Sequence, residues 1–68
     1  MGTRIIFTDE STGIAGVWNG SRTINIHLWI DGSRLGTEID VITLMDGQYD
    51  EAIDAFQDMV EWYEARRS

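Results

Sequence analysis

The sequence predicts an α+β fold, in which a four-stranded antiparallel β-meander is followed by one C-terminal amphipathic α-helix packed on one face (ββββα). Three observations carry this prediction: an apolar repeat with helical spacing near the C-terminus, four short segments rich in β-branched residues before it, and two Asn-Gly or Asp-Gly steps between those segments. Such steps favour tight hairpin turns, because these residues tolerate positive φ. At 68 residues the chain is expected to form a single domain, residues 1–68.

The helix is predicted over residues 46–67, with Asp46 as its N-cap. At about 100° per residue, its apolar positions fall within an arc of about 120°, which suits packing against a sheet. These positions are Tyr49, Ala52, Ile53, Phe56, Met59, Val60 and Tyr63. Trp62 falls about 60° outside this arc. It is expected either to cover a sheet edge or to act as an anchor beside the polar face of the helix.

Four strands are expected, over residues 3–8, 14–18, 23–30 and 35–43. Two-residue loops at Asn19-Gly20 and Asp31-Gly32 would fix the register of the last three strands. The face beneath the helix would then carry an alternating apolar row from the third strand and the inward residues of its neighbours: Ala15, Val17, Ile24, Ile26, Leu28, Ile30, Leu35, Ile39 and Val41. In the first strand, Ile5 and Phe7 are expected inward because this orientation buries the larger pair.

The same register predicts a second sheet face that no helix covers. Its candidate interface residues are Trp18, His27, Trp29, Arg34 and Ile42, with Trp29 opposite Arg34 in position for a cation–π contact. Tryptophan is enriched at interface hot spots, so this face predicts a homodimer or an assembly module. The alternative is a partly hydrated face on which the tryptophans stack on their neighbours.

The charge of the chain points to a basic partner. Its net charge is −7, with 12 acidic residues, 5 arginines and no lysine. Direct binding to nucleic acid is therefore not expected, because phosphate contacts require a basic surface. Six carboxylates occupy the polar face of the helix: Asp50, Glu51, Asp54, Asp58, Glu61 and Glu64. This face is interpreted either as a binding surface for a basic protein or as a solvated face that keeps a small protein in solution.

No motif for catalysis, cofactor binding or metal binding is present, and we expect a binding protein without a cofactor rather than an enzyme. The absence of cysteine excludes a disulfide scaffold and a cysteine-based zinc site. His27 is the only histidine, and no serine lies in a nucleophile-elbow sequence. Glu38 and Asp40 are expected on the face of His27, so a small enzyme or ligand site centred there is the least favoured alternative.

No apolar segment reaches the length of a membrane span, and no secretory leader is recognisable. We therefore expect a cytoplasmic protein without a membrane partner. In size, charge and lack of catalytic motifs, the chain resembles the small accessory proteins of bacteriophages, among them inhibitors of CRISPR and restriction systems. This resemblance is to a class and involves no shared motif. It implies an inhibitor or modulator of a basic nucleic-acid-handling protein in the host cytoplasm.

The spacing of the helix carboxylates is compatible with DNA mimicry. From Asp50 to Glu64 the helix rises about 21 Å, or roughly 4 Å per interval between the six charges. The phosphates along one DNA strand are ~3.4 Å apart.

Overall fold

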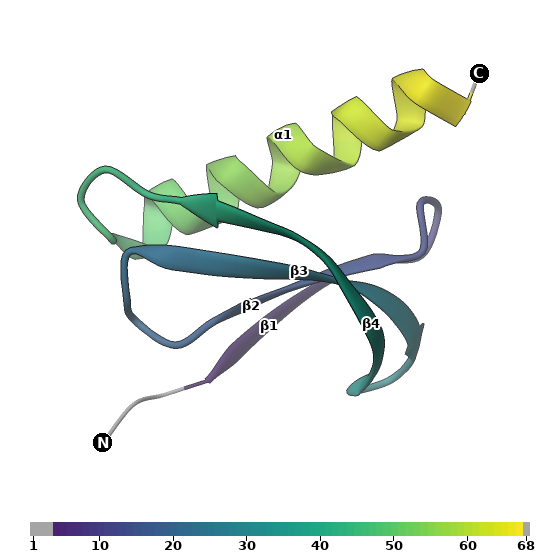
Figure 1. The fold of residues 1–68 in the computed structure, drawn as a ribbon, viewed down its shortest axis with the longest axis horizontal. Helices are drawn as coiled ribbons and strands as arrows, with labels where there is room; N and C mark the ends of the chain where they lie inside the picture. The colour runs from purple at the N-terminus through teal and green to yellow at the C-terminus, as the bar shows by residue number, and fades with distance from the viewer. Residues whose placement is uncertain (1–3, 68) are drawn as a thin grey trace.

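The computed structural model describes residues 4–66 in full and the backbone of residue 67. It contains β1 (Ile5–Asp9), β2 (Ile14–Trp18), β3 (Thr23–Asp31), β4 (Arg34–Thr43) and α1 (Tyr49–Arg67). The strands form one antiparallel sheet in the order β1-β2-β3-β4, and α1 lies along one side of it (Figure 1). The predicted ββββα fold is confirmed. The predicted first strand began at Thr3, which lies outside the described residues.

The helix and the sheet share one hydrophobic core, and Phe56 lies at its centre. The Phe56 ring stacks on Phe7 with the ring centroids 5.7 Å apart, and it also covers Gly16. The buried cluster consists of Ile14, Trp18, Ile24, Ile26, Leu44, Ala52, Phe56 and Val60. Ile5 and Phe7 pack against this cluster, which confirms their predicted inward orientation.

The helix begins later than predicted. Its first residue is Tyr49, and the amide of Ala52 donates to the carbonyl oxygen of Gln48 at 3.0 Å. Gln48 therefore occupies the N-cap position, and Asp46 belongs to the preceding loop. Glutamine is a poor cap, because the favoured caps are short side chains that reach the free amides of the first turn. Other groups must therefore accept hydrogen bonds from the free backbone amides of the loop and of the first helical turn.

Glu51, the third residue of the helix, binds the loop that precedes α1. Its carboxylate accepts hydrogen bonds from the backbone amides of Met45, Asp46 and Gly47. Gly47 has a φ of 74°, a conformation that glycine adopts without strain. The loop thus aims consecutive N–H groups at one anion, as in the backbone nests that bind anions elsewhere.

β2 turns the opposite side chains to the core from those predicted. Its register with β3 places Ile14, Gly16 and Trp18 beneath α1 and directs Ala15 and Val17 to the other face of the sheet. The larger pair is thereby buried: Ile14 is 2% exposed and Trp18 is 7% exposed. The prediction that Ala15 and Val17 lie beneath the helix, with Trp18 on the uncovered face, is wrong, although Ala15 is itself fully buried.

The reason lies in the loop between β2 and β3. It spans residues 19–22 instead of the predicted two-residue Asn19-Gly20 turn. A type I′ turn requires positive φ at both central residues, but Gly20 has a φ of 85° and Asn19 has none in the positive range. The indole N–H of Trp18 donates to the carbonyl oxygen of Ser21 at 2.7 Å, so the longer loop also satisfies this buried donor.

The turn between β3 and β4 is shifted by one residue. Asp31 pairs with Arg34, so the turn residues are Gly32 and Ser33 instead of Asp31 and Gly32. Only Gly32 has positive φ, at 48°, which fits a type II′ turn. A further register shift between Trp29 and Asp31 pairs Trp29 with Leu35, and the predicted position of Arg34 opposite Trp29 is wrong.

A bulge at Ile39 changes the face of the following residues of β4. Asp40 pairs with Ile26 and Glu38 pairs with His27, which leaves Ile39 between them without a partner. Asp40 and the residues after it therefore face the opposite side of the sheet from the one predicted. Ile42 pairs with Ile24 on the helix side, whereas Ile39 and Val41 are 36% and 47% exposed.

The helix covers only part of the apolar row of β3. Ile24 and Ile26 are fully buried, but Leu28 and Ile30 are 46% and 53% exposed. Figure 1 shows the reason: the second half of α1 and the β3–β4 hairpin diverge toward opposite sides of the molecule. An opening between α1 and β4 is lined by side chains of both elements.

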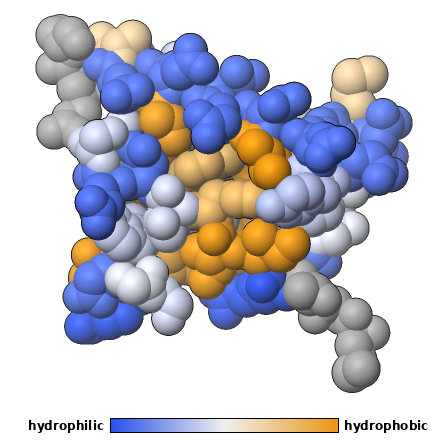
Figure 2. Space-filling view, turned by 180° about the vertical axis from the view of Figure 1, so that it is seen from behind, coloured by the Kyte–Doolittle hydropathy of each residue, from blue (hydrophilic) through white to orange (hydrophobic). Residues whose placement is uncertain are grey.

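Apolar surface reaches the outside in several places. Figure 2, which views the side turned away in Figure 1, shows a central apolar region framed by hydrophilic side chains. Across the described residues, the exposed large apolar side chains are Leu28, Ile30, Ile39, Val41, Met45, Tyr49 and Trp62. They are distributed over β3, β4, α1 and the loop before it, and so do not define one uncovered sheet face. None of the described helices combines the length and apolar character needed to cross a membrane.

Candidate protein-binding site

The outer side of α1 carries a row of exposed carboxylates, here named the acidic stripe. Its members are Asp50, Asp54, Asp58, Glu61 and Glu64. At about 100° per residue they lie within an arc of about 120°, directed away from the buried Ala52, Phe56 and Val60. The amphipathic pattern that buries one side of α1 thus also gathers these charges on the other.

Four members of the acidic stripe keep an unneutralised charge within the described part of the chain. The side chains of Asp50, Asp54, Asp58 and Glu61 form no hydrogen bond or ion pair there. Asp50 and Asp54, and likewise Asp54 and Asp58, are like-charge neighbours at i,i+4, an arrangement that slightly destabilises a helix. The stripe therefore presents a concentrated negative potential to solvent.

Glu51 has a different role from the other predicted members of the acidic face. Its carboxylate faces the loop, where the amide of Asp46 donates at 2.9 Å and that of Gly47 at 3.0 Å. The pKa of Glu51 is held below its usual range by the Asp46 amide first and then by the Met45 amide, because both donors stabilise the charged form. This carboxylate is thus engaged in ordering the start of α1.

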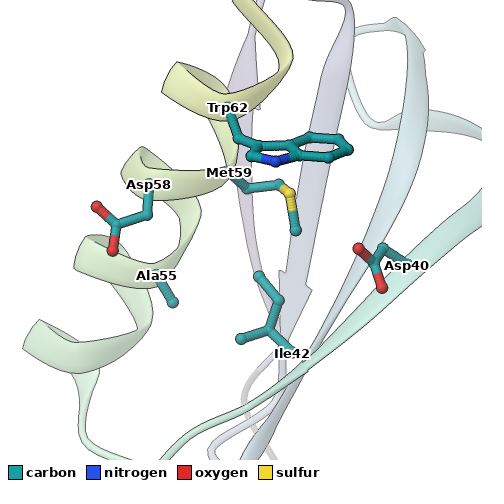
Figure 3. A pocket seen from close by; sticks show the side chains of 6 residues that line it. All are labelled: Asp40, Ile42, Ala55, Asp58, Met59 and Trp62. Atoms are coloured by element: carbon teal, nitrogen blue, oxygen red, sulfur yellow. The ribbon is translucent and has the colours of Figure 1, made fainter. Parts of the chain in front are cut away.

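Beside the acidic stripe, the opening between α1 and β4 contains a pocket of about 430 Å³, here named the Trp62 pocket. It is lined by Asp40, Ile42, Ala55, Asp58, Met59 and Trp62. Figure 3 shows the apolar side chains of Ile42, Ala55 and Met59 gathered between the helix and β4, with the Trp62 indole extending over Met59. The Asp40 carboxylate is directed from β4 toward this apolar group (Figure 3).

Trp62 is held by contacts with its own helix. Its ring meets Tyr63 edge-on with the centroids 4.8 Å apart, and Cζ of Arg66 lies 4.5 Å from its centroid. The indole nevertheless remains 49% exposed. Trp62 was predicted either over a sheet edge or beside the polar face of the helix. In the structure it lines a pocket with the edge strand β4 and also lies next to Asp58 of the acidic stripe.

The sequence did not reveal this pocket, because Asp40 and Ile42 were assigned to the opposite face of the sheet. The bulge at Ile39 turns both residues toward α1. A signal was available in the pattern: Ile39, Val41 and Ile42 are all apolar, so strict alternation cannot bury them together on one face.

The five residues predicted to share the uncovered sheet face, Trp18, His27, Trp29, Arg34 and Ile42, do not lie on one face. Trp18 lies in the core, where its ring centroid is 5.9 Å from that of Tyr49, and Ile42 lines the Trp62 pocket. Near the β3–β4 turn, the Trp29 indole N–H donates to the carbonyl oxygen of Gly32 at 2.9 Å. Arg34 Nη1 lies 3.9 Å from Asp31 Oδ2. A dimer through paired tryptophans therefore loses the surface on which it depended.

His27 is surrounded by structural contacts. Its Nδ1 lies 3.1 Å from the carbonyl oxygen of Gly36, so this nitrogen acts as the donor, and its Nε2 lies 3.9 Å from Glu38 Oε1. The same Glu38 oxygen accepts from Asn25 Nδ2 at 2.8 Å. Asp40, predicted on this face, lies on the other. Among the described residues, no group of three His, Asp or Glu side chains is placed to hold a metal ion.

Comparison with protein-family models, curated proteins and solved structures found no significant match to this chain. The functional interpretation therefore depends on the acidic stripe and the Trp62 pocket.

Proposed function

We propose that this chain is a small binding module that uses the acidic stripe to occupy the nucleic-acid-binding surface of a basic protein and thereby inhibits or modulates it. The observation that carries the proposal is the row of exposed carboxylates, of which Asp50, Asp54, Asp58 and Glu61 lack any partner within the described residues. A helix that is selected only for stability would place cations between them at i,i+4.

The physical basis is electrostatic complementarity. A surface of one sign attracts a partner of the opposite sign from a distance and accelerates association, and it disfavours partners of the same sign. The net charge of −7 adds to the attraction of basic partners and to the repulsion of acidic ones. A protein that handles nucleic acid has the required basic surface, because it must contact phosphates.

The geometry supports a general form of DNA mimicry. With Glu51 engaged by the loop, the remaining carboxylates are separated by about 5 Å along a helix rise of about 21 Å. This interval is wider than the ~3.4 Å between phosphates of one strand. The acidic stripe therefore resembles a strand of DNA in sign and length, without matching it phosphate by phosphate. We place this activity in the cytoplasm, with nucleases of CRISPR or restriction systems as one class of partner.

Affinity capture with a charge-reversed variant tests the proposal. Immobilised parent chain should retain a basic nucleic-acid-binding protein from a lysate of the source cells, and the variant D54K/D58K/E61K should not. Retention should fall as ionic strength rises, because screening weakens charge attraction. The melting temperature of the variant should stay unchanged or rise, since like-charge repulsion along α1 is relieved.

The matched control is E10K/D31K/D46K, which changes the net charge equally at exposed positions outside the acidic stripe. It should retain the partner. Equal capture by all three proteins, or capture that does not respond to salt, would contradict the proposal.

A further inference from the structure

We propose that the Trp62 pocket binds the side chain of an arginine residue supplied by the basic partner. The inference builds on the proposed function, which provides a basic partner. It adds a defined anchoring site to a surface that would otherwise attract its partner by charge alone.

The chemistry of the pocket matches an arginine side chain in two parts. Ile42, Ala55 and Met59 offer apolar contacts to a three-carbon stem, and Asp40 offers a carboxylate to the charged end. One Asp40 oxygen accepts from the amide of Val41 at 2.8 Å, which fixes the orientation of the group and leaves the other oxygen for a ligand. A planar guanidinium is preferred over an ammonium here, because it binds carboxylates with several donors and stacks on aromatic rings.

The Trp62 ring already binds one guanidinium within the chain. Cζ of Arg66 lies 4.5 Å from the ring centroid, within the range of a cation–π contact. This contact shows that the exposed indole is accessible to an arginine side chain. It also makes Arg66 an internal competitor and a source of repulsion for an incoming cation.

The pocket is continuous with the acidic stripe. Asp58 belongs to both, since it lines the pocket and lies between Asp54 and Glu61 on the outer side of α1. A partner attracted by the stripe therefore meets the pocket at its edge. The volume of about 430 Å³ is in the lower part of the range of about 300–1,000 Å³ typical of ligand sites, and it accommodates one long side chain.

The test uses acetylated, amidated tetra-arginine as the probe, with tetra-lysine and tetra-citrulline as its charged and neutral counterparts. Binding is followed by ¹⁵N NMR at low ionic strength, with the Trp62 indole N–H as the local reporter. Tetra-arginine should shift this signal and bind more tightly than tetra-lysine. Tetra-citrulline should not bind.

Four variants locate the binding site. Asp40→Asn and Asp58→Asn should each weaken tetra-arginine binding by about three- to fivefold, a size appropriate to partly exposed ion pairs. Ala55→Leu, which fills the pocket on a helix that tolerates leucine, should abolish the Trp62 shift. Arg66→Gln should strengthen binding because it removes the competing cation. The matched control is Asp54→Asn, which removes a charge from the acidic stripe outside the pocket and should have a clearly smaller effect than Asp40→Asn.

Equal losses in Asp54→Asn and Asp40→Asn, together with unchanged binding in Ala55→Leu, would overturn the pocket while leaving the acidic stripe as the binding surface. An absence of tetra-arginine binding would also overturn the pocket. The proposed function is judged separately by affinity capture with D50K/D54K/E61K, which reverses three charges of the acidic stripe and leaves every residue that lines the pocket unchanged.

Discussion

Single residues determine how the loop before α1 is ordered. Glu51 supplies the negative charge, and Gly47 supplies the positive φ that brings the backbone amides of Met45 and Asp46 toward it. A Cβ at position 47 would also lie 3.0 Å from Cγ of Arg22 and 3.2 Å from the Ser21 carbonyl oxygen. The β2–β3 loop and the start of α1 are therefore packed together at this point.

The stability of the fold should depend on the ionisation of Glu51. Because hydrogen bonds lower its pKa in the folded state from the usual 4.5, the charged form favours folding. This contribution is present above about pH 4.5 and is lost as the pH falls through the lowered folded-state value. Asp9 contributes in the same direction, chiefly because the Thr12 hydroxyl lowers its pKa. Glu51→Gln should reduce the melting temperature at pH 7, and the difference should shrink as the pH falls through the lowered folded-state pKa of Glu51.

Thermal unfolding followed by circular dichroism from pH 3 to pH 7 measures this effect. Glu10→Gln removes an exposed carboxylate of the β1–β2 turn and serves as the control. A Glu51→Gln variant that keeps the parent melting temperature at pH 7 would show that the amide cluster does not stabilise the folded chain.

At the scale of the elements, the packing of α1 on the sheet is set by the fit of Phe56 against Gly16. A Cβ at position 16 would lie 2.8 Å from Cδ1 of Phe56 and 3.1 Å from Cδ1 of Ile24. The helix therefore approaches β2 closely only because that position has no side chain. This fit sets the position of the first half of α1 relative to the sheet.

Gly16→Ala should destabilise the protein by about 1–3 kcal/mol through overpacking, although alanine is usually the more favourable residue in a strand interior. Adding Phe56→Leu should recover part of this loss, since the smaller side chain vacates the contact. Denaturant unfolding of the parent, both single variants and the double variant measures the coupling. Additive effects of the two substitutions would show that Phe56 does not lie over Gly16.

The elements were predictable from the sequence to different degrees. The position of β2, the fold and the apolar side of α1 follow from local pattern and are confirmed. The face of β2 was mistaken because the Asn19-Gly20 step was given more weight than burial. The criterion that correctly oriented Ile5 and Phe7, burial of the larger pair, would also have selected Ile14 and Trp18.

The Trp62 pocket was less predictable because it depends on non-local features. It requires the bulge at Ile39, which only the apolar residues Ile39, Val41 and Ile42 hint at, and the divergence of α1 from the β3–β4 hairpin, which no local pattern indicates. The acidic stripe, in contrast, follows directly from helical periodicity. Only Glu51 was misjudged, because its role depends on a helix that starts at Tyr49.

At the scale of the whole molecule, the sheet serves mainly to support α1. The core holds one side of the helix, and the acidic stripe lies on the opposite side of α1. The pocket lies at the junction of the two layers, where Asp58 connects it to the stripe. We propose that this combined surface occupies the site at which a basic partner binds nucleic acid.

The most direct test is competition for the captured partner. The purified partner is first bound to a fluorescently labelled DNA duplex, and fluorescence anisotropy is followed as the chain is added. The parent chain and E10K/D31K/D46K should release the DNA, and D54K/D58K/E61K should leave it bound. A ternary complex, in which the partner holds the parent chain and the duplex at the same time, would contradict the claim.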